Sequence, residues 1–217
     1  MKKIIIIGGY GNGSVAQSTI EDINKEKNQF EILGYLNDFE EQPINGIPII
    51  GKVNKDTIDK FRVYNDVFFY YSLISIKFNY KFLTKLYSLE LPLDKFPALI
   101  HPTAVISNNA KIGFGCCINP FVSVGPNVVI GNHVQIYGQA LIGHGASLGD
   151  FVYVANNACI GAEVSLLEGS YLGTNCSIRE FVEVGKWSIV GMGSVVLNNI
   201  PDLTKFAGNP AKFIGHN

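Results

Sequence analysis

The sequence lacks any strong imbalance of charge. Its 217 residues hold 17 lysines and arginines against 18 aspartates and glutamates, for a formal net charge of −1, and the isoelectric point is about 6.4. Nucleic acid and anionic membrane surfaces are recognised by broad basic patches, which such a balance does not supply. The composition therefore argues against a nucleic-acid partner.

Long apolar runs are also missing. The longest, around Val67 to Ile76, holds about ten residues broken by serine, which is too short to span a bilayer. The opening segment, MKKIIIIGG, lacks the apolar core and the cleavage site of a signal peptide. We therefore expect no membrane insertion and a cytoplasmic protein.

Cysteine motifs are absent as well. The four cysteines show no CxxC spacing, and no set of histidines accompanies them as a zinc site would require. We expect no metal site, and we expect the cysteines to be reduced residues of the core. They are Cys116, Cys117, Cys159 and Cys176.

The sequence does contain a long internal repeat. Every sixth residue from Ile106 to Val196 is Ile, Leu or Val, glycine usually follows it, and a small or β-branched residue stands two positions before it. A period of six fits neither the 3.6-residue period of a helix nor the period of two of a strand. The pattern predicts a triangular prism in which each hexad forms one short strand and one corner. We expect the glycines to supply the positive φ angles of the corners, and no long loop to project.

The first part of the chain differs from the repeat. KKIIIIGG is typical of a buried strand, GYGNGS of a glycine-rich turn, and Ser14 to about Asn24 of a helix with Ser14 as a possible N-cap. FEILGYLND predicts a second strand, and a strand near residues 67–73 and a helix near 79–88 follow. This order favours a small Rossmann-like α/β domain. Pro92 and Pro97, in the segment LPLDKFPALIHPTA, mark the connection between the domains, and we expect domains at residues 1–95 and 96–217.

The glycine-rich turn is a candidate phosphate site. Gly8, Gly9 and Gly11 would let backbone N–H groups approach a phosphate at the start of a helix. A dinucleotide fingerprint would need a further glycine where Ser14 stands, which disfavours an NAD enzyme. A plain tight turn is the alternative interpretation.

Together the two parts resemble the NeuD/PglD-like family of bacterial sugar O/N-acyltransferases, over essentially the whole chain. The hexapeptide repeat, the glycine turn, INGIPIIG at residues 44–51 and GNPAK at residues 208–212 carry this resemblance. It implies a small Rossmann-like α/β N-terminal domain followed by a left-handed parallel β-helix. It also implies acetyl transfer from acetyl-CoA and a homotrimer of β-helices packed side by side.

For the N-terminal domain, the resemblance implies binding of a nucleotide-linked amino sugar. The glycine turn would hold its phosphates, the end of the second strand its base, and a polar segment before the catalytic motif its sugar. The predicted residues are Gly8, Gly9, Tyr10, Gly11, Asn37, Asp38 and Tyr137. Tyr137 is a departure from the family, since Tyr137-Gly138-Gln139 stands where relatives often have Asn-Thr or Asn-Ser.

For catalysis, the resemblance points to His144 in LIGHGAS, which matches the family's general base. Imidazole suits this role near neutral pH. Many relatives carry an acidic residue after the base, whereas this chain has Gly145. Tyr153 stands where some relatives place a histidine or threonine near the acyl oxygen, and it either donates to the oxyanion or packs on the prism. We expect no catalytic role for the other histidines, with His133 at the surface.

Coenzyme A is expected to run along the prism from the base towards the C-terminus. One 18-residue coil beyond His144 lies Ala162, a small residue whose backbone amide could meet the pantetheine arm. The resemblance implies that the GNPAK segment lies near the adenosine. The predicted coenzyme residues are Gly143, Ala162, Asn209, Pro210 and Lys212.

Alternative functions stay open at this point. The favoured one is N-acetylation of a nucleotide-linked amino(dideoxy) sugar for surface polysaccharide, lipopolysaccharide or glycan biosynthesis, by direct attack. The alternatives are O-acetylation of sialic acid or of another small acceptor, and a non-catalytic β-helix scaffold. His144 favours the enzyme, while Gly145 slightly favours the scaffold.

Overall fold

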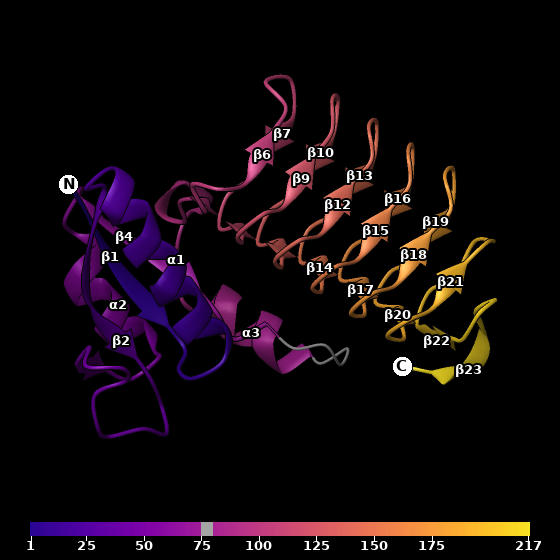
Figure 1. The fold of residues 1–217 in the computed structure, drawn as a ribbon. Coiled ribbons are helices and arrows are strands. Elements are labelled where there is room, and N and C mark those ends of the chain that lie inside the picture. Colours follow the sequence, from indigo (N-terminus) through magenta and orange to yellow (C-terminus); the bar gives the residue numbers. More distant parts are fainter. Residues whose placement is uncertain (75–79) are drawn as a thin grey trace. The chain divides into compact units, whose positions relative to one another are not determined.

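The computed structural model describes residues 1–74 and 80–217. The chain forms two compact units, one reaching to Pro102 and the other running from Thr103 to Asn217 (Figure 1). The sequence placed the boundary slightly earlier, between residues 95 and 96.

The N-terminal unit contains a parallel sheet of four strands in the order β3-β2-β1-β4. A helix follows β1, β3 and β4 along the chain, in keeping with the Rossmann-like prediction, whereas β2 and β3 follow one another without a helix between them. The strands are β1 (Lys2–Ile7), β2 (Phe30–Leu36), β3 (Ile49–Gly51) and β4 (Val67–Tyr71); the helices are α1 (Asn12–Glu26), α2 (Lys55–Arg62) and α3 (Tyr80–Ser88). A 3₁₀ turn at Leu93–Lys95 and the short β5 (Leu99–Ile100) complete the unit.

Strand β1 is one of the two inner strands of this sheet, between β2 and β4. Its four isoleucines, Ile4 to Ile7, are all fully buried, as expected for a parallel strand covered on both faces. The sequence did not predict β3, which has only three residues, or α2, which begins at the capping residue Asn54. Asn79, where the helix predicted near residues 79–88 began, lies outside the described residues.

Helix α1 begins earlier than predicted. Its N-cap is Gly11, with a φ of 79°, and no side chain caps it. The prediction that Ser14 is the N-cap was wrong: Ser14 lies within the helix, where its hydroxyl accepts a hydrogen bond from Asn45 Nδ2 at 3.0 Å. The left-handed backbone of Gly11 lets the chain turn directly from the strand into the helix.

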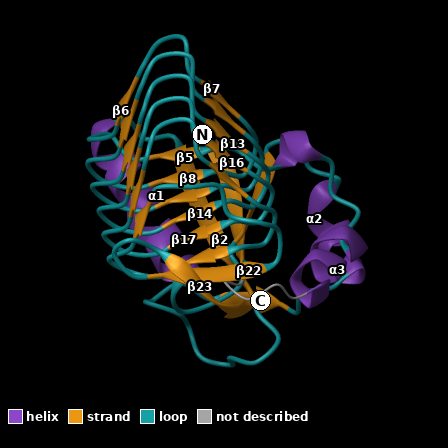
Figure 2. Ribbon diagram, turned by 90° about the vertical axis from the view of Figure 1, so that its right-hand side faces the viewer, coloured by secondary structure: helices purple, strands orange, loops and turns teal. Residues whose placement is uncertain are grey.

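The C-terminal unit is a left-handed parallel β-helix, as predicted (Figures 1 and 2). Its strands are two residues long, and each pairs in parallel with the strand 18 residues later, as in Gln135 with Tyr153. No long loop interrupts the strands between β6 and β21. They are β6 (Val105–Ile106), β7 (Lys111–Ile112), β8 (Cys117–Ile118), β9 (Ser123–Val124), β10 (Val129–Ile130), β11 (Gln135–Ile136), β12 (Leu141–Ile142), β13 (Ser147–Leu148), β14 (Tyr153–Val154), β15 (Cys159–Ile160), β16 (Ser165–Leu166), β17 (Tyr171–Leu172), β18 (Ser177–Ile178), β19 (Glu183–Val184), β20 (Ile189–Val190) and β21 (Val195–Val196).

Three sheets form the faces of this prism. The first runs through β6, β9, β12, β15, β18 and β21, the second through β7, β10, β13, β16 and β19, and the third through β8, β11, β14, β17 and β20. The aliphatic residue of each hexad and the small or β-branched residue two positions before it fill the interior, since Ile160 and Ala158, for example, are at most 1% exposed.

The glycines that follow the aliphatic residues have a different purpose from the one predicted. Positive φ angles recur every sixth position from Gly115 to Gly193, two residues after those glycines. The glycine itself is needed for space: a Cβ on Gly143 would lie 2.6 Å from the carbonyl carbon of Gly161 and 2.7 Å from the amide nitrogen of Ala162. Close contact between successive coils therefore selects glycine there.

The last residues cover the open end of the prism. Strand β22 (Thr204–Ala207) pairs with β20, and β23 (Lys212–His216) folds back on β22. Ile200 bridges Val184 at the end of the second sheet. Val195 N, on the first sheet, donates to Gly208 O at 3.0 Å. This C-terminal segment, residues 198–217, thus reaches the edge of all three sheets.

Two predictions about exposure were wrong. His133, expected at the surface, is 2% exposed and stacks on the buried Phe151, with ring centroids 5.3 Å apart. Burial lowers the pKa of His133 to about 4, although Asp150 opposes the shift. Cys159, expected in the core, is exposed because it takes an outward position of β15. Within residues 1–74 and 80–217, no helix has the length and apolar character needed to cross a membrane.

Candidate active site

His144 lies at the corner between β12 and β13, and its side chain is 65% exposed. The backbone beneath the ring is held firmly. Gly143 N donates to Ile160 O at 2.8 Å, and His144 O accepts from Glu163 N at 2.9 Å. The corner therefore presents an accessible imidazole on a fixed backbone.

A carboxylate lies beside this imidazole. Glu163 Oε1 is 3.9 Å from His144 Nδ1, and Glu163 stands one coil, 18 residues, after Gly145. A Cβ added to Gly145, whose φ is +69°, would overlap the Glu163 carboxylate. The acidic group that the sequence seemed to lack is thus present from the next coil, and sequence reasoning missed it.

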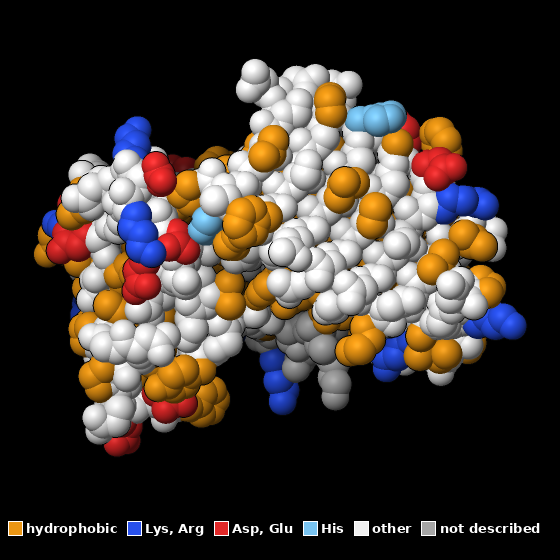
Figure 3. Space-filling view, in the orientation of Figure 1, with side chains coloured by type: hydrophobic (Ala, Val, Ile, Leu, Met, Phe, Trp, Pro, Cys, Tyr) orange, Lys and Arg blue, Asp and Glu red, His pale blue; other side chains and the backbone are white. Residues whose placement is uncertain are grey.

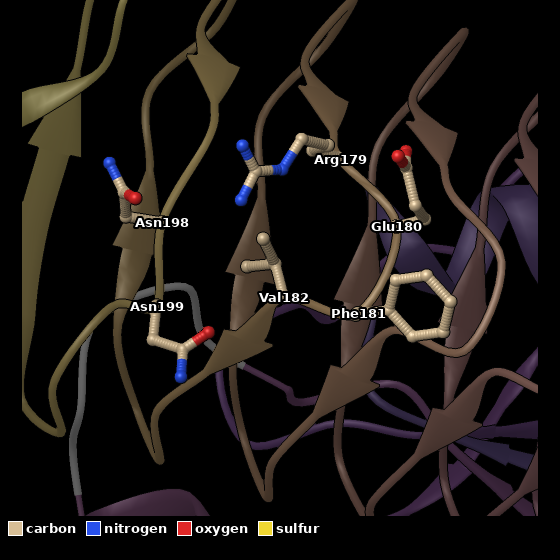
Figure 4. Close-up of a pocket in the computed structure, with 6 residues that line it drawn as sticks. All are labelled: Arg179, Glu180, Phe181, Val182, Asn198 and Asn199. Carbon is tan, nitrogen blue, oxygen red and sulfur yellow. The ribbon is translucent and has the colours of Figure 1, made fainter.

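The same corner continues towards the C-terminus. Steps of 18 residues from His144 reach Ala162 and then Glu180, so these residues stack along one edge of the prism. Beyond Ala162 the edge opens into a groove of about 630 Å³ that contains the guanidinium of Arg179. In Figure 4 this group extends towards Asn198. The groove is lined by Arg179, Glu180, Phe181, Val182, Asn198 and Asn199.

Arg179 was not among the predicted residues. The repeat offered a signal for it, because Arg179 stands two coils, 36 residues, after Gly143 and therefore on the same corner as His144. Of the predicted coenzyme residues, the structure brings Gly143 and Ala162 to this corner. Asn209, Pro210 and Lys212 are exposed in and after the turn between β22 and β23.

The two predicted tyrosines lie elsewhere on the prism. Tyr153 stacks between Tyr137 and Tyr171, with ring centroids 4.9 and 5.0 Å apart. Tyr153 and Tyr171 belong to the third sheet, whereas His144 lies between the first and second. Burial raises the pKa of Tyr153. A role for Tyr153 beside an imidazole would therefore require the imidazole of a second copy of the chain.

In the N-terminal unit, Asn37 has a structural role. Its side chain is buried, its Nδ2 donates to Gly8 O at 2.9 Å, and its Oδ1 accepts from the backbone of Phe39 and Glu40 at 2.7 Å. A Cβ on Gly9 would lie 2.5 Å from Asn37 Nδ2. Asn37 thus fixes the loop after β2 against the glycine turn.

Asp38, the next residue, is held from two sides. One oxygen accepts from Val53 N at 2.8 Å and the other pairs with Lys85 Nζ at 2.9 Å. Burial acts to raise the pKa of Asp38, but the Lys85 ion pair and the Val53 hydrogen bond outweigh it and lower that pKa below its ordinary value. The carboxylate is therefore charged at neutral pH.

The glycine turn opens onto the start of α1. Tyr10 is 61% exposed and Gly11 is exposed, and the first turn of α1 contains no acidic residue. Helix N-termini attract anions through their N–H groups and dipole. Among the described residues, no group of three or more His, Cys, Asp or Glu is placed to hold a metal ion.

Comparison with known proteins gives matches for both units. Residues 3–69 match the PglD N-terminal domain, and residues 103–144 match the bacterial transferase hexapeptide, a model of six repeats. A comparison with curated protein sequences finds no match.

Solved structures match across almost the whole chain. The acetyltransferase domain of PglB from Neisseria gonorrhoeae is 25% identical with a TM-score of 0.84, covering 99% of this chain and 100% of that one. A variant of perosamine N-acetyltransferase from Caulobacter crescentus, in complex with CoA and GDP-perosamine, is 21% identical with a TM-score of 0.86, covering 99% and 98%. WeeI from Acinetobacter baumannii is 23% identical with a TM-score of 0.79, covering 98% and 100%.

The two model matches follow one another along the chain in the order that the sequence predicted, and the PglB domain has the same order over its full length. These findings confirm the resemblance to the NeuD/PglD-like family of bacterial sugar acyltransferases and, with it, the acyltransferase class of enzyme.

Proposed function

We propose that this protein transfers the acetyl group of acetyl-CoA to the amine of a nucleotide-linked amino sugar, with His144 as the general base. The observation that carries the proposal is the exposed imidazole of His144 beside a carboxylate, on a prism joined to a PglD-type domain. Structures of related fold contain acetyl coenzyme A or both CoA and GDP-perosamine, which supports this pair of substrates.

The chemistry follows from the accessible ring. A sugar amine is mostly protonated near pH 7 and must be neutral to attack. Its nitrogen forms a bond to the thioester carbonyl carbon, and His144 takes the proton that the nitrogen loses. The tetrahedral intermediate then collapses, the carbon–sulfur bond breaks, and the imidazolium returns the proton to the thiolate of CoA. No acyl-enzyme is needed, and a positioned base of this kind contributes about 10²–10⁴ in rate.

The coenzyme is proposed to lie along the catalytic corner. The pantetheine arm would pass the small side chain of Ala162, and the groove beyond it offers Arg179 to a phosphate group. Asn209, Pro210 and Lys212 remain proposed contacts of the adenosine end. The turn that holds Asn209 and Pro210 is anchored on the first sheet, since Ala211 N donates to Val195 O at 2.8 Å.

The acceptor is proposed to bind through its nucleotide in the N-terminal unit. The start of α1, reached through Gly9 and Gly11, would face the phosphates. Asp38 is charged and would accept from a ring N–H of uracil, thymine or guanine. Because Asn37 is occupied within the fold, it would act by shaping the loop rather than by binding the base.

The active unit is proposed to be a homotrimer. The outward positions of the first sheet are uncharged over six successive coils, and Figure 3 shows this face as hydrophobic and neutral side chains. Such a face suits packing against another copy. A neighbouring chain would also supply Tyr153 to the catalytic corner. The outward residues are Val105, Ser123, Leu141, Cys159, Ser177 and Val195.

The test begins with thermal shift in the presence of UDP-, dTDP-, GDP- and CMP-linked amino sugars, with and without acetyl-CoA. Release of free CoA thiol is then measured with the sugar that stabilises the protein most. We expect His144→Ala to lower kcat by about 10²–10⁴ while acetyl-CoA still stabilises the variant. Wild-type kcat in the folded variant would remove His144 as the base, and no acetyl transfer to any amino sugar would reject the function.

A further inference from the structure

We propose that Glu163 is the positioning residue for His144, in place of a carboxylate at position 145. The inference rests on the proposed function, because it assigns a partner to the proposed base. Its starting point is the 3.9 Å separation between Glu163 Oε1 and His144 Nδ1.

The two residues are joined through the backbone as well. Glu163 N donates to His144 O at 2.9 Å, so the coil that carries the carboxylate is locked to the coil that carries the ring. Both side chains are more than half exposed, so a hydrogen bond between them needs only a small rotation of exposed side chains. Hydrogen bonds of catalytic groups are often long without substrate and tighten in the complex.

Gly145 is what makes this arrangement possible. The Glu163 side chain folds back over Gly145 and occupies the place where a Cβ at position 145 would stand. The same relationship recurs in this chain at Gly169, where Trp187 of the next coil fills the corresponding space. An acidic residue at position 145 and the present placement of Glu163 therefore exclude one another.

The alternative that Glu163 serves another cation is not supported. Within the described parts of the chain, His144 is the only basic side chain within 4.0 Å of its carboxylate. A hydrogen bond from His144 Nδ1–H to Glu163 would hold the ring and leave Nε2 as the site that accepts the proton. Glu163 would then act through His144 and touch neither the sugar nor the thioester.

The first test removes the charge of Glu163 and keeps the size and shape of its side chain. We expect Glu163→Gln to lower kcat about 10- to 100-fold, by analogy with the effect of removing the carboxylate partners of metal-binding histidines, with the KM for acetyl-CoA changed less than threefold. Glu183→Gln removes an exposed carboxylate from β19 of the same prism and is expected to leave kcat unchanged. Light scattering and thermal unfolding confirm that each variant is folded.

The second test relocates the carboxylate. Asp tolerates the left-handed backbone of position 145, and Asn127, at the equivalent position of the preceding coil, has a φ of 59°. We expect Glu163→Ala to have a lower kcat than the wild type. Gly145→Asp combined with Glu163→Ala should have a kcat at least tenfold higher than that of Glu163→Ala alone. Gly145→Asp alone gives no gain, because the new side chain displaces Glu163.

The third test asks whether Glu163 acts through the base. In a His144→Ala background, Glu163→Gln should lower kcat no further, since residues that act as a unit are not additive. If His144→Ala is impaired while Glu163→Gln matches wild type, or if the relocated carboxylate restores nothing, Glu163 has no such role and the proposed function stands. If His144→Ala itself matches wild type, the general-base proposal fails instead.

Discussion

Lys85 Nζ lies 2.9 Å from an oxygen of Asp38, and the other oxygen of the same carboxylate accepts from Val53 N. This carboxylate therefore has two uses: it ties α3 and the segment before α2 to the end of β2, and it is the proposed contact of the acceptor base. Substitution of Asp38 is therefore expected to change both the stability of the fold and the affinity for the acceptor.

We expect Asp38→Asn to lower both stability and acceptor affinity. The folded-state pKa of Asp38 is depressed, so its stabilisation is complete above the unfolded pKa of about 4 and is lost as pH falls through the folded pKa. The variant should be about 1–2 kcal/mol less stable at pH 7, and this difference should shrink as pH falls through the folded-state pKa of Asp38. Lys85→Met serves as the control, since it breaks the ion pair and keeps the base contact. Calorimetry that finds the same acceptor affinity for the wild type, Asp38→Asn and Lys85→Met would contradict the proposed contact between Asp38 and the base.

Arg179 should matter more than Lys212 for coenzyme binding. Arg179 lies in the groove on the catalytic corner, whereas Lys212 is at the start of the last strand. We expect Arg179→Ala to raise the KM for acetyl-CoA about 10-fold, equivalent to about 1.4 kcal/mol, with kcat little changed. Lys186→Ala, on a different corner, is the matched control. An unchanged KM in Arg179→Ala would show that the coenzyme takes another path.

The uncharged face of the first sheet predicts the response of the assembly to a new charge. We expect wild-type protein to scatter light as a trimer of the 23.7 kDa chain at micromolar concentration. Leu141→Glu places a charge on that face and should dissociate the trimer, because an unpaired buried charge is costly. Val129→Glu, on the second sheet, should leave the assembly intact. A monomeric wild-type protein would contradict the proposed assembly.

Two serines one coil apart should respond oppositely to truncation. Ser170 is fully buried, and among the described residues its hydroxyl has no hydrogen-bond partner. Ser188 is equally buried, but its hydroxyl donates to Pro201 O at 2.6 Å. Ser170→Ala should be neutral or stabilising by up to about 1 kcal/mol, while Ser188→Ala should cost about 1–2 kcal/mol. Urea unfolding of both variants checks this, and equal losses would contradict it.

The β-helix could be predicted from the sequence because every hexad buries its aliphatic residue in the same way. Ile160 and its equivalents must point inward in every coil, so their spacing records the fold directly. The left hand of the helix came only from the resemblance. The purpose of the glycines was misjudged, because the overlap at Gly143 involves backbone from the next coil, which a linear pattern does not display.

The site was only partly readable. His144 stood out through its motif, whereas Glu163 is separated from it in sequence and becomes its neighbour only when the chain closes a full coil. Asn37 was predicted to contact the base, and its hydrogen bond to Gly8 O was not predicted because it depends on the loop after β2. His133 was placed at the surface because polarity alone does not reveal a corner where the ring folds inward over Gly115.

The C-terminal segment has a consequence for solubility. The last coil of a parallel β-helix would otherwise present unpaired N–H and C=O groups in three sheets, a template on which the coil of another molecule could stack. Residues 198–217 occupy those groups, and β23 turns antiparallel, so further coils cannot add in the same direction. The segment thus caps this end of the β-helix and opposes end-to-end polymerisation between molecules.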